Sequence, residues 1–201
     1  MRVYGCRSHF EKGENVGGLS KKTAKKRQTG TKTRWKPDLD VFTEINVPDE
    51  YYRDVLKRQA VVNPNLLFVY RKEEPNGSFT ESQYLYENGI SDYVQELAGD
   101  TALTSIQYWN CQREGKDRED KPTYKVKLSV ALTFSNRVQQ IEYYHNSSFL
   151  EHGGSPERAV KQAFVSQLDS WLKSNGKYLK NESKITFADV EDCLILVSSS
   201  F

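Results

Sequence analysis

The sequence contains few of the residues that form disulfides or bind metals. Its 201 residues include only three cysteines and three histidines. Cys6, Cys111 and Cys193 are odd in number and far apart, and they form no Cys-x-x-Cys pair. This pattern excludes a disulfide framework and predicts reduced thiols, as in the cytoplasm. The three histidines are not spaced as metal ligands either, so no metal site is expected.

Long apolar runs are also missing. No run approaches the roughly 18 residues that cross a bilayer, and residues 1–6 resemble the start of a strand rather than a signal peptide. Charged residues make up 28% of the chain and the mean hydropathy is −0.74. We therefore expect a soluble cytoplasmic protein without membrane contact, long enough for one full domain and part of another.

The net charge of +2 hides an uneven distribution. Residues 1–36 carry 11 Lys and Arg against 2 Asp and Glu, whereas residues 37–201 carry 18 against 25. The basic excess centres on residues 21–27, Lys-Lys-Thr-Ala-Lys-Lys-Arg. Two interpretations remain open: a solvated loop between strands, or a surface that binds nucleic-acid phosphates.

The order of predicted elements indicates an α+β protein. Alternation of Val126, Leu128, Val130 and Leu132 with polar or small residues predicts a strand over 124–134. Further strands are expected at 66–71, 79–86, 104–112, 138–144 and 194–197. Helices are expected at 49–61, at 91–97 and from Ser155, as N-cap of the longest helix, to Gly176. An apolar stripe on that longest helix comprises Val160, Phe164, Leu168, Trp171 and Leu172.

We expect the strands of the main domain to form a mixed sheet with the helices gathered mainly on one face. Two further strands are predicted at 3–11 and 30–36, the second stopped by Pro37-Asp38. Because a strand pair is marginal without a covering layer, the first 45 residues resemble the remnant of something larger.

Several motifs, in order along the chain, resemble one family. Residues 29–38 read Thr-Gly-Thr-Lys-Thr-Arg-Trp-Lys-Pro-Asp, and residues 86–94 read Tyr-Glu-Asn-Gly-Ile-Ser-Asp-Tyr-Val. Gly153-Gly154-Ser155 precedes the longest helix, and Asp-Val-Glu-Asp-Cys-Leu occupies 189–194. These motifs are similar to those of the B subunits of DNA gyrase and other type IIA DNA topoisomerases.

The resemblance implies a two-part organisation. Residues 1–45 would be the C-terminal remnant of the ATPase domain, its last strand pair. Residues 46–201 would be the transducer domain, with two layers and a mixed four-stranded sheet. In this family the transducer couples ATP binding and hydrolysis to DNA strand passage. The resemblance thus implies that the parent protein is an ATP-hydrolysing DNA topoisomerase, an isomerase.

The resemblance also implies candidate binding residues. Most of the family's ATP and Mg²⁺ site would lie outside residues 1–201, so no cofactor and no catalysis are expected for this chain alone. Thr31, after Gly30, would bond near the adenine; alternatively, the two residues only begin a strand. Lys161 would face transported DNA, with Arg158 and Lys173 as further DNA-binding candidates; alternatively, Lys161 belongs to an ordinary polar helix face.

The resemblance implies transported duplex DNA and the topoisomerase A subunit as partners of the full-length protein, and a monomeric state for this chain. Two other functions remain possible from the sequence. One is a free-standing basic nucleic-acid-binding α+β protein that uses residues 21–36. The other is the equivalent domain of a mismatch-repair or chaperone ATPase.

Overall fold

The computed structural model describes residues 4–23, 29–116 and 118–201. Contacts divide the chain into two compact units, Met1–Asn46 and Val47–Phe201. Most of the basic run, residues 24–27, lies outside the described residues. The predicted remnant and transducer assignments of the two parts stay predictions. Among the described residues, no helix is both long and apolar enough to cross a membrane.

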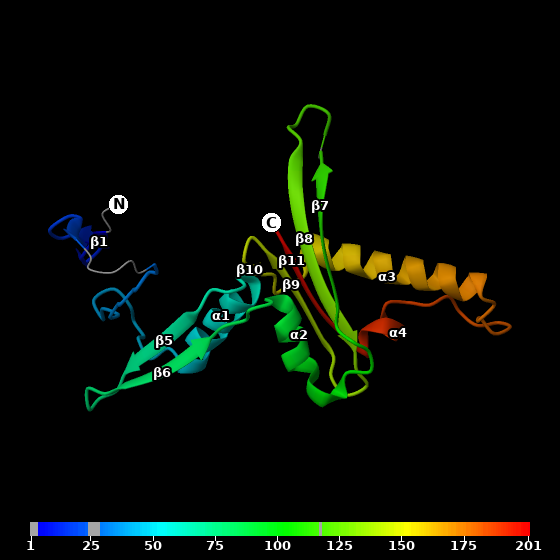
Figure 1. Cartoon of the computed structure of the whole chain (residues 1–201), viewed down its shortest axis with the longest axis horizontal. Helices are drawn as coiled ribbons and strands as arrows, with labels where there is room; N and C mark the ends of the chain where they lie inside the picture. Colours follow the sequence, from blue (N-terminus) through cyan, green and yellow to red (C-terminus); the bar gives the residue numbers. More distant parts are fainter. Residues whose placement is uncertain (1–3, 24–28, 117) are drawn as a thin grey trace. The chain divides into compact units, whose positions relative to one another are not determined.

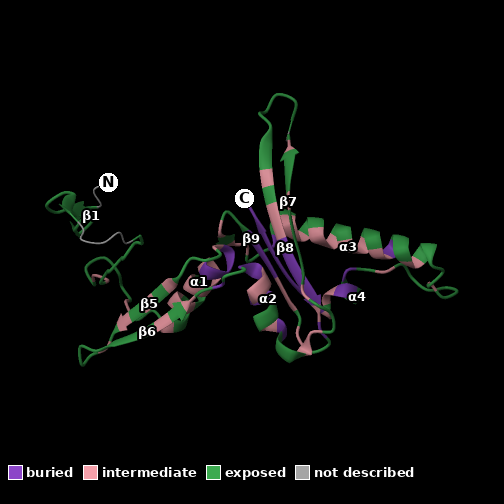
Figure 2. Ribbon diagram, viewed as in Figure 1, coloured by how far each residue is buried: buried purple, intermediate pink, exposed green. Residues whose placement is uncertain are grey.

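The first unit consists of two short antiparallel ribbons. Strand β1 (Tyr4–Arg7) pairs with β4 (Ser20–Thr23), and β2 (Phe10–Glu11) pairs with β3 (Glu14–Asn15). None of the described residues of this unit is buried, as the exposed ribbons in Figure 2 show. Large apolar side chains, such as those of Phe10 and Phe42, therefore remain more than half exposed.

The strand predicted over residues 30–36 is not formed. Residues 29–38 have no regular secondary structure, and the chain turns only after Asp38, whose carbonyl accepts from the amides of Val41 and Phe42. A strand needs a neighbouring ladder, and no strand among the described residues pairs with this segment, so the alternating pattern alone does not produce one. The predicted strand pair is therefore wrong: the stretch predicted as one strand at 3–11 contains two short strands, β1 and β2, and β1 pairs with β4 instead of with residues 30–36.

A mixed five-stranded sheet forms the centre of the second unit. Its order is β10 (Ser148–Phe149), β9 (Gln140–His145), β11 (Leu194–Ser200), β8 (Tyr124–Phe134) and β7 (Gln107–Gly115). Of the pairs in this sheet, β9 with β11 is parallel. The α+β class and the mixed sheet are confirmed, but the predicted count of four strands is wrong. The sequence pattern missed β10 because two residues are too few for an alternation.

Helices cover both faces of this sheet, which corrects the prediction that they gather mainly on one. Ala131, Tyr144 and Ile195 pack on one face with buried residues of α1 (Asp49–Val62) and α2 (Ile90–Ala98). On the other face, Val130, Tyr143 and Leu196 pack with α3 (Gly154–Ser174) and α4 (Ala188–Glu191). The unit thus has three layers rather than two.

The physical reason lies in β11. All its residues are buried, and Leu194 to Val197 form a continuous apolar run whose side chains alternate between the two faces. A strand that is apolar on both sides requires cover on both sides.

Strands β5 (Phe68–Glu73) and β6 (Phe79–Tyr84) form a separate hairpin. Gly77, with a φ of 80°, lies in its turn, as the Asn76-Gly77 pair predicted. Helix α1 packs against this hairpin, with Tyr52 stacked on Tyr70 at 5.9 Å between ring centroids. A short 3-10 helix (Gly99–Thr101) follows α2.

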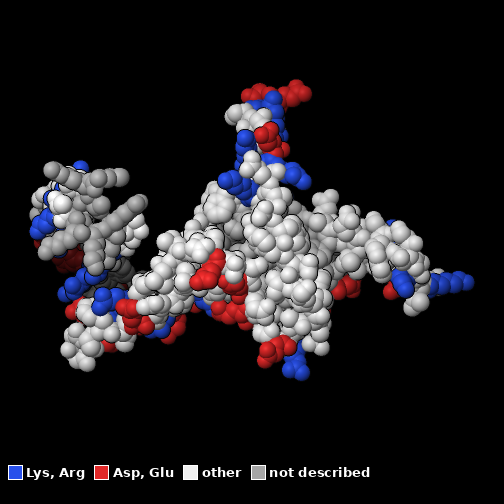
Figure 3. Space-filling model, in the orientation of Figure 1, with Lys and Arg blue, Asp and Glu red and all other residues white. Residues whose placement is uncertain are grey.

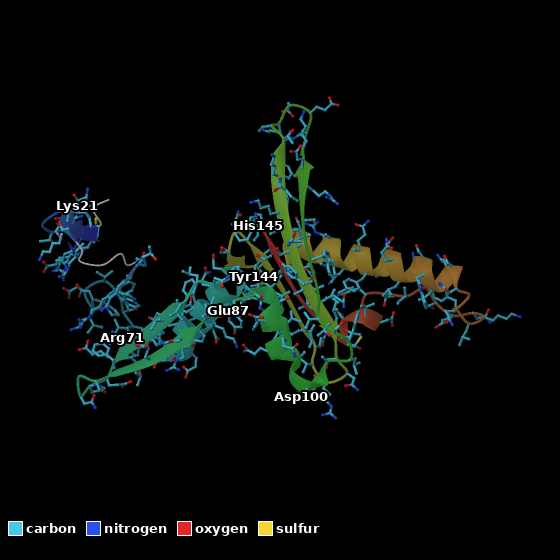
Figure 4. All side chains as sticks on the ribbon, viewed as in Figure 1. Lys21, Arg71, Glu87, Asp100, Tyr144 and His145 are labelled. Carbon is cyan, nitrogen blue, oxygen red and sulfur yellow. The ribbon has the colours of Figure 1, made fainter. Side chains whose placement is uncertain are left out.

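A carboxylate lies buried between the sheet and α2. Glu142 of β9 is 4% exposed and accepts hydrogen bonds from Tyr93 (2.9 Å), Tyr144 (2.5 Å) and Gln140 (2.9 Å). Tyr144, labelled in Figure 4, belongs to the same apolar cluster as the buried residues of α1 and α2. Glu142 therefore ties the sheet to α2 through polar contacts inside an apolar layer.

Candidate nucleic-acid interface on the long helix

The three predicted DNA-binding residues all lie on α3, so the candidate site is built from this helix. Helix α3 starts at Gly154, after Gly153 with a φ of 65°. Ser155 is inside the first turn and does not cap the helix, contrary to the prediction. A β-carbon at position 153 would collide with the side chain of Glu157. Glycine at 153 thus allows both the left-handed turn and the position of Glu157.

Replacing Gly153 with alanine should therefore destabilise the start of α3. The left-handed backbone costs a non-glycine residue about 1–3 kcal/mol, and the Glu157 side chain must move as well. We expect a loss of about 2 kcal/mol in the free energy of unfolding, measured by urea denaturation. The matched control is Ser155→Ala, which should change stability by less than about 0.5 kcal/mol. Gly13→Ala does not serve as a control, because Gly13 lies in the other unit.

A cleft of about 580 Å³ lies beside the start of α3. Its lining includes Glu157 and Lys161 of α3, Tyr143 of β9, and Phe187 and Glu191 around α4. Burial raises the pKa of Tyr143 to about 12, and Glu157 and Glu191 add to the shift. Tyr143 therefore stays protonated at neutral pH. The lining combines one lysine with three glutamates, Glu151, Glu157 and Glu191, so the cleft itself is not cationic.

Lys161 is already engaged inside this cleft. Its Nζ lies 2.8 Å from Glu157 Oε1, at the (i, i+4) spacing of a helix, and 5.5 Å from the centre of the Phe187 ring. The hydrogen bond to Glu157 raises the pKa of Lys161 above its ordinary value. Lys161 would have to share or leave Glu157 in order to bind a phosphate.

Arg158 and Lys173 differ in their surroundings. Arg158 is exposed, and within the described part of the chain no carboxylate lies at ion-pair distance from it. Lys173 donates to Asp169 Oδ2 at 2.8 Å, which raises its pKa. The structure thus places the three predicted residues on one helix, but two of the three cations already have acidic partners.

Asp169, which sequence analysis missed, holds the segment that follows α3. It is 6% exposed and accepts from Lys173 and from Tyr178 (2.9 Å), with Lys184 at 3.4 Å. Tyr178 in turn accepts from the amide of Ile185 at 3.1 Å. The (i, i+4) spacing of Asp169 and Lys173 was a usable signal in the sequence. The contacts of Tyr178 and Lys184 depend on the chain folding back.

These contacts predict a pH-dependent contribution to stability. Lys173 first, then Tyr178 and Lys184, hold the pKa of Asp169 below its ordinary value, against the effect of burial. A carboxyl with a lowered folded-state pKa stabilises the fold above its unfolded pKa, near 4, and loses that effect as the pH falls through the folded value. Asp169→Asn should therefore lower the melting temperature at pH 7, and the difference from the unaltered chain should shrink below about pH 4.

The measurement is thermal unfolding by circular dichroism at pH 7 and pH 3. Asp120→Asn, at an exposed position, is the matched control and should change neither value. An Asp169→Asn difference that stayed constant across this range would contradict the role given to these ion pairs.

The predicted nucleotide-binding residues lie in the first unit. Gly30 and Thr31 are exposed in the segment without regular structure. Their contact with ATP stays a prediction. Among the described residues, no cluster of three or more His, Cys, Asp or Glu side chains could hold a metal ion.

Comparison with known proteins finds similarity along most of the chain. The DNA gyrase B protein of Streptococcus pyogenes serotype M1 is 27% identical over 177 residues, which are 85% of this chain and 25% of that protein. The DNA topoisomerase 4 B protein of Streptococcus pneumoniae is 24% identical over 197 residues, 96% of this chain and 28% of that protein. The chain thus spans about a quarter of the length of these curated relatives.

Solved structures share the fold. The 43K ATPase domain of Thermus thermophilus gyrase B, solved with an aminocoumarin, has a TM-score of 0.65 at 22% identity, covering 97% of this chain and 51% of that one. The DNA gyrase B protein of Myxococcus xanthus has a TM-score of 0.68 at 13% identity, covering 98% and 53%.

The family profile described as DNA gyrase B matches residues 89–201, more than half of the chain. The match covers α2, the whole five-stranded sheet and α3. This match favours the predicted relation to the B subunits of type IIA topoisomerases. It does not favour the two alternatives, a free-standing nucleic-acid-binding protein and a mismatch-repair or chaperone ATPase. This chain belongs to the DNA gyrase B family.

Proposed function

We propose that this chain is the transducer segment of the ATPase-bearing protein of a type IIA DNA topoisomerase, preceded by the end of its ATPase domain. In this role it couples ATP binding and hydrolysis to DNA strand passage. The observation that carries the proposal is the DNA gyrase B match over residues 89–201, which coincides with the layered sheet and α3.

The arrangement suits a coupling element. The sheet is covered on both faces, and β11 is buried along its whole length. Such a body moves as a unit, because packed interiors transmit displacement rather than absorb it. Helix α3 is supported on the sheet through Val160, Phe164 and Leu168 and carries Arg158 on its exposed side. A change at one end of this body can therefore displace a DNA-contacting helix.

The proposal assigns ATP and Mg²⁺ to the full-length protein, with Gly30 and Thr31 beside the nucleotide. It assigns transported DNA to α3, where Lys161, Arg158 and Lys173 meet phosphates without reading sequence. The topoisomerase A subunit is the protein partner, and the cytoplasm is the compartment.

A chimera tests this function. This chain replaces the matching segment of the Streptococcus pyogenes DNA gyrase B protein, and the chimera is assayed with that enzyme's A subunit for ATP-dependent change of plasmid linking number. We expect ATP-dependent topology change. A chimera that binds and hydrolyses ATP but leaves the linking number unchanged would show that this chain does not perform the coupling. Arg158→Gln in the chimera should lower strand-passage activity more than ATP hydrolysis.

A further inference from the structure

The two longest strands of the sheet extend beyond it as a free arm. Strand β8 pairs with β11 only as far as Leu128, opposite Ser200, and Lys127 then exchanges two backbone hydrogen bonds of 2.9 Å with Phe201. Beyond this point β8 pairs with β7 alone, through Glu114 opposite Lys125 and Gly115 opposite Tyr124. Figure 1 shows this ribbon projecting past the end of the sheet. We call residues 112–127 the arm.

The arm has no apolar core of its own. None of its described residues is buried. Local contacts hold it: Lys125 lies 3.5 Å from Glu114, and the Tyr124 ring lies across Gly115, where a β-carbon would come within 2.7 Å of that ring. Glycine opposite an aromatic residue is a known way to stabilise a ribbon. The arm is therefore a paired ribbon whose two faces are open to a partner.

Charge on the arm is segregated. Its stem, residues 112–116 and 121–127, carries five cations and one acid, whereas the four residues between them in the sequence, 117–120, carry three acids and one arginine. Figure 3 shows Lys and Arg along this projection and Asp and Glu at its end. Residues 37–201 as a whole are acidic, with 18 basic and 25 acidic side chains. The stem is thus a local cationic surface on an acidic body.

Two stem cations are placed to bind an external anion. Within the described part of the chain, neither Arg113 nor Lys127 has a carboxylate at ion-pair distance, whereas Lys125 has Glu114. Arg113 pairs with Val126, and Lys127 pairs with Gln112, so the two cations point to opposite faces of the ribbon. One cation on each face can meet phosphates on both sides of a groove.

We propose that the stem of the arm binds the major groove of duplex DNA, with Arg113 and Lys127 on the phosphates of its two walls. A major groove about 12 Å wide admits a two-stranded ribbon. The five residues 112–116 of one stem strand span about 14 Å at strand spacing, so the stem can lie along the groove with one face toward each wall. Phosphate contacts of this kind carry no sequence preference.

This inference rests on the proposed function for its choice of DNA as partner, and it adds a contact outside α3. The test is fluorescence anisotropy of a labelled mixed-sequence duplex, about three helical turns long, with the 201-residue chain at several salt concentrations. The variant is Arg113→Gln with Lys127→Gln. The matched control is Arg137→Gln with Lys180→Gln, which removes two exposed cations that also have no carboxylate at ion-pair distance in the described part of the chain. Circular dichroism checks that both variants fold.

The expected readout is the salt dependence of binding. Each phosphate contact contributes about 0.9 to the slope of log affinity against log salt, so the arm variant should reduce the slope by about 2 and the affinity at least about tenfold at about 0.1 M salt. The control should keep the slope of the unaltered chain. A small loss of stability in the arm variant would not reduce the slope of log affinity against log salt. A purely structural role of Arg113 and Lys127 would therefore not produce this result.

Other outcomes overturn the inference. An unchanged slope in the arm variant together with weaker binding by Arg158→Gln would assign the contact to α3 alone, and the proposed function would stand. Stronger binding of single-stranded DNA than of duplex would exclude the groove geometry. If the unaltered chain bound no duplex, the arm would not be a DNA site, and the linking-number assay of the chimera would judge the proposed function separately.

Discussion

Replacing Glu142 with alanine is expected to lower the free energy of unfolding by about 3 kcal/mol, because buried hydroxyls would lose their acceptor. Tyr93 and Tyr144 both donate to this carboxylate from the layer between the sheet and α2. Burial first, and then Glu142, raise the pKa of both tyrosines above the ordinary value, so they remain donors at neutral pH. Each buried donor left without a partner costs about 1–3 kcal/mol.

Urea denaturation of Glu142→Ala, Tyr144→Phe and the double variant measures this effect. Removing the Tyr144 hydroxyl in the Glu142→Ala background should recover part of the loss, because one orphaned donor disappears. Glu119→Ala, at an exposed position, is the matched control and should stay within about 0.5 kcal/mol of the unaltered chain. Additive losses in the double variant would mean that Glu142 and Tyr144 are not coupled.

A loss of similar size, again about 3 kcal/mol, is expected for Leu196→Ala in β11. Leu196 is fully buried and packs in the cluster between the sheet and α3. Truncation removes apolar contact and leaves a cavity in a central strand that has little freedom to collapse, since β8 and β9 flank it. The melting temperature should fall accordingly, as followed by far-ultraviolet circular dichroism.

Leu179→Ala is the matched control for this substitution. Leu179 is 76% exposed, so the same change of side chain should alter stability by less than about 0.5 kcal/mol. Equal effects at the two positions would contradict the assignment of the core to β11.

The regular elements of the second unit could be predicted from local patterns. The strand at 124–134 is confirmed, since Val130 and Leu132 do alternate with residues on the other face. The helix predicted at 49–61 is observed at 49–62. Trp171 was wrongly placed in the apolar stripe of α3: it is 55% exposed, because helical periodicity does not show how far along a helix its packing partner extends.

The candidate site was less predictable. The sequence placed Lys161, Arg158 and Lys173 on one helix, and the structure agrees. It did not identify Glu157 and Asp169 as partners of the two lysines, although each stands four residues before a lysine. The approach of Phe187, Tyr178 and Lys184 to α3 depends on chain reversal, for which no local pattern exists. The strand expected at 30–36 failed for the same reason, since pairing is a non-local property.

The position of β11 also has a consequence for how this sheet forms during synthesis. Of the five strands, the one that leaves the ribosome last is the middle one, and it joins β9 to β8 through two ladders. Until it arrives, β8 pairs only with β7, and β9 only with the two-residue β10. During synthesis the sheet therefore stays incomplete until β11 is made, and the edges of β8 and β9 that later pair with β11 remain exposed. Deleting a few residues of β11 would therefore separate β9 from β8 and divide the sheet, whereas deleting an edge strand would only narrow it.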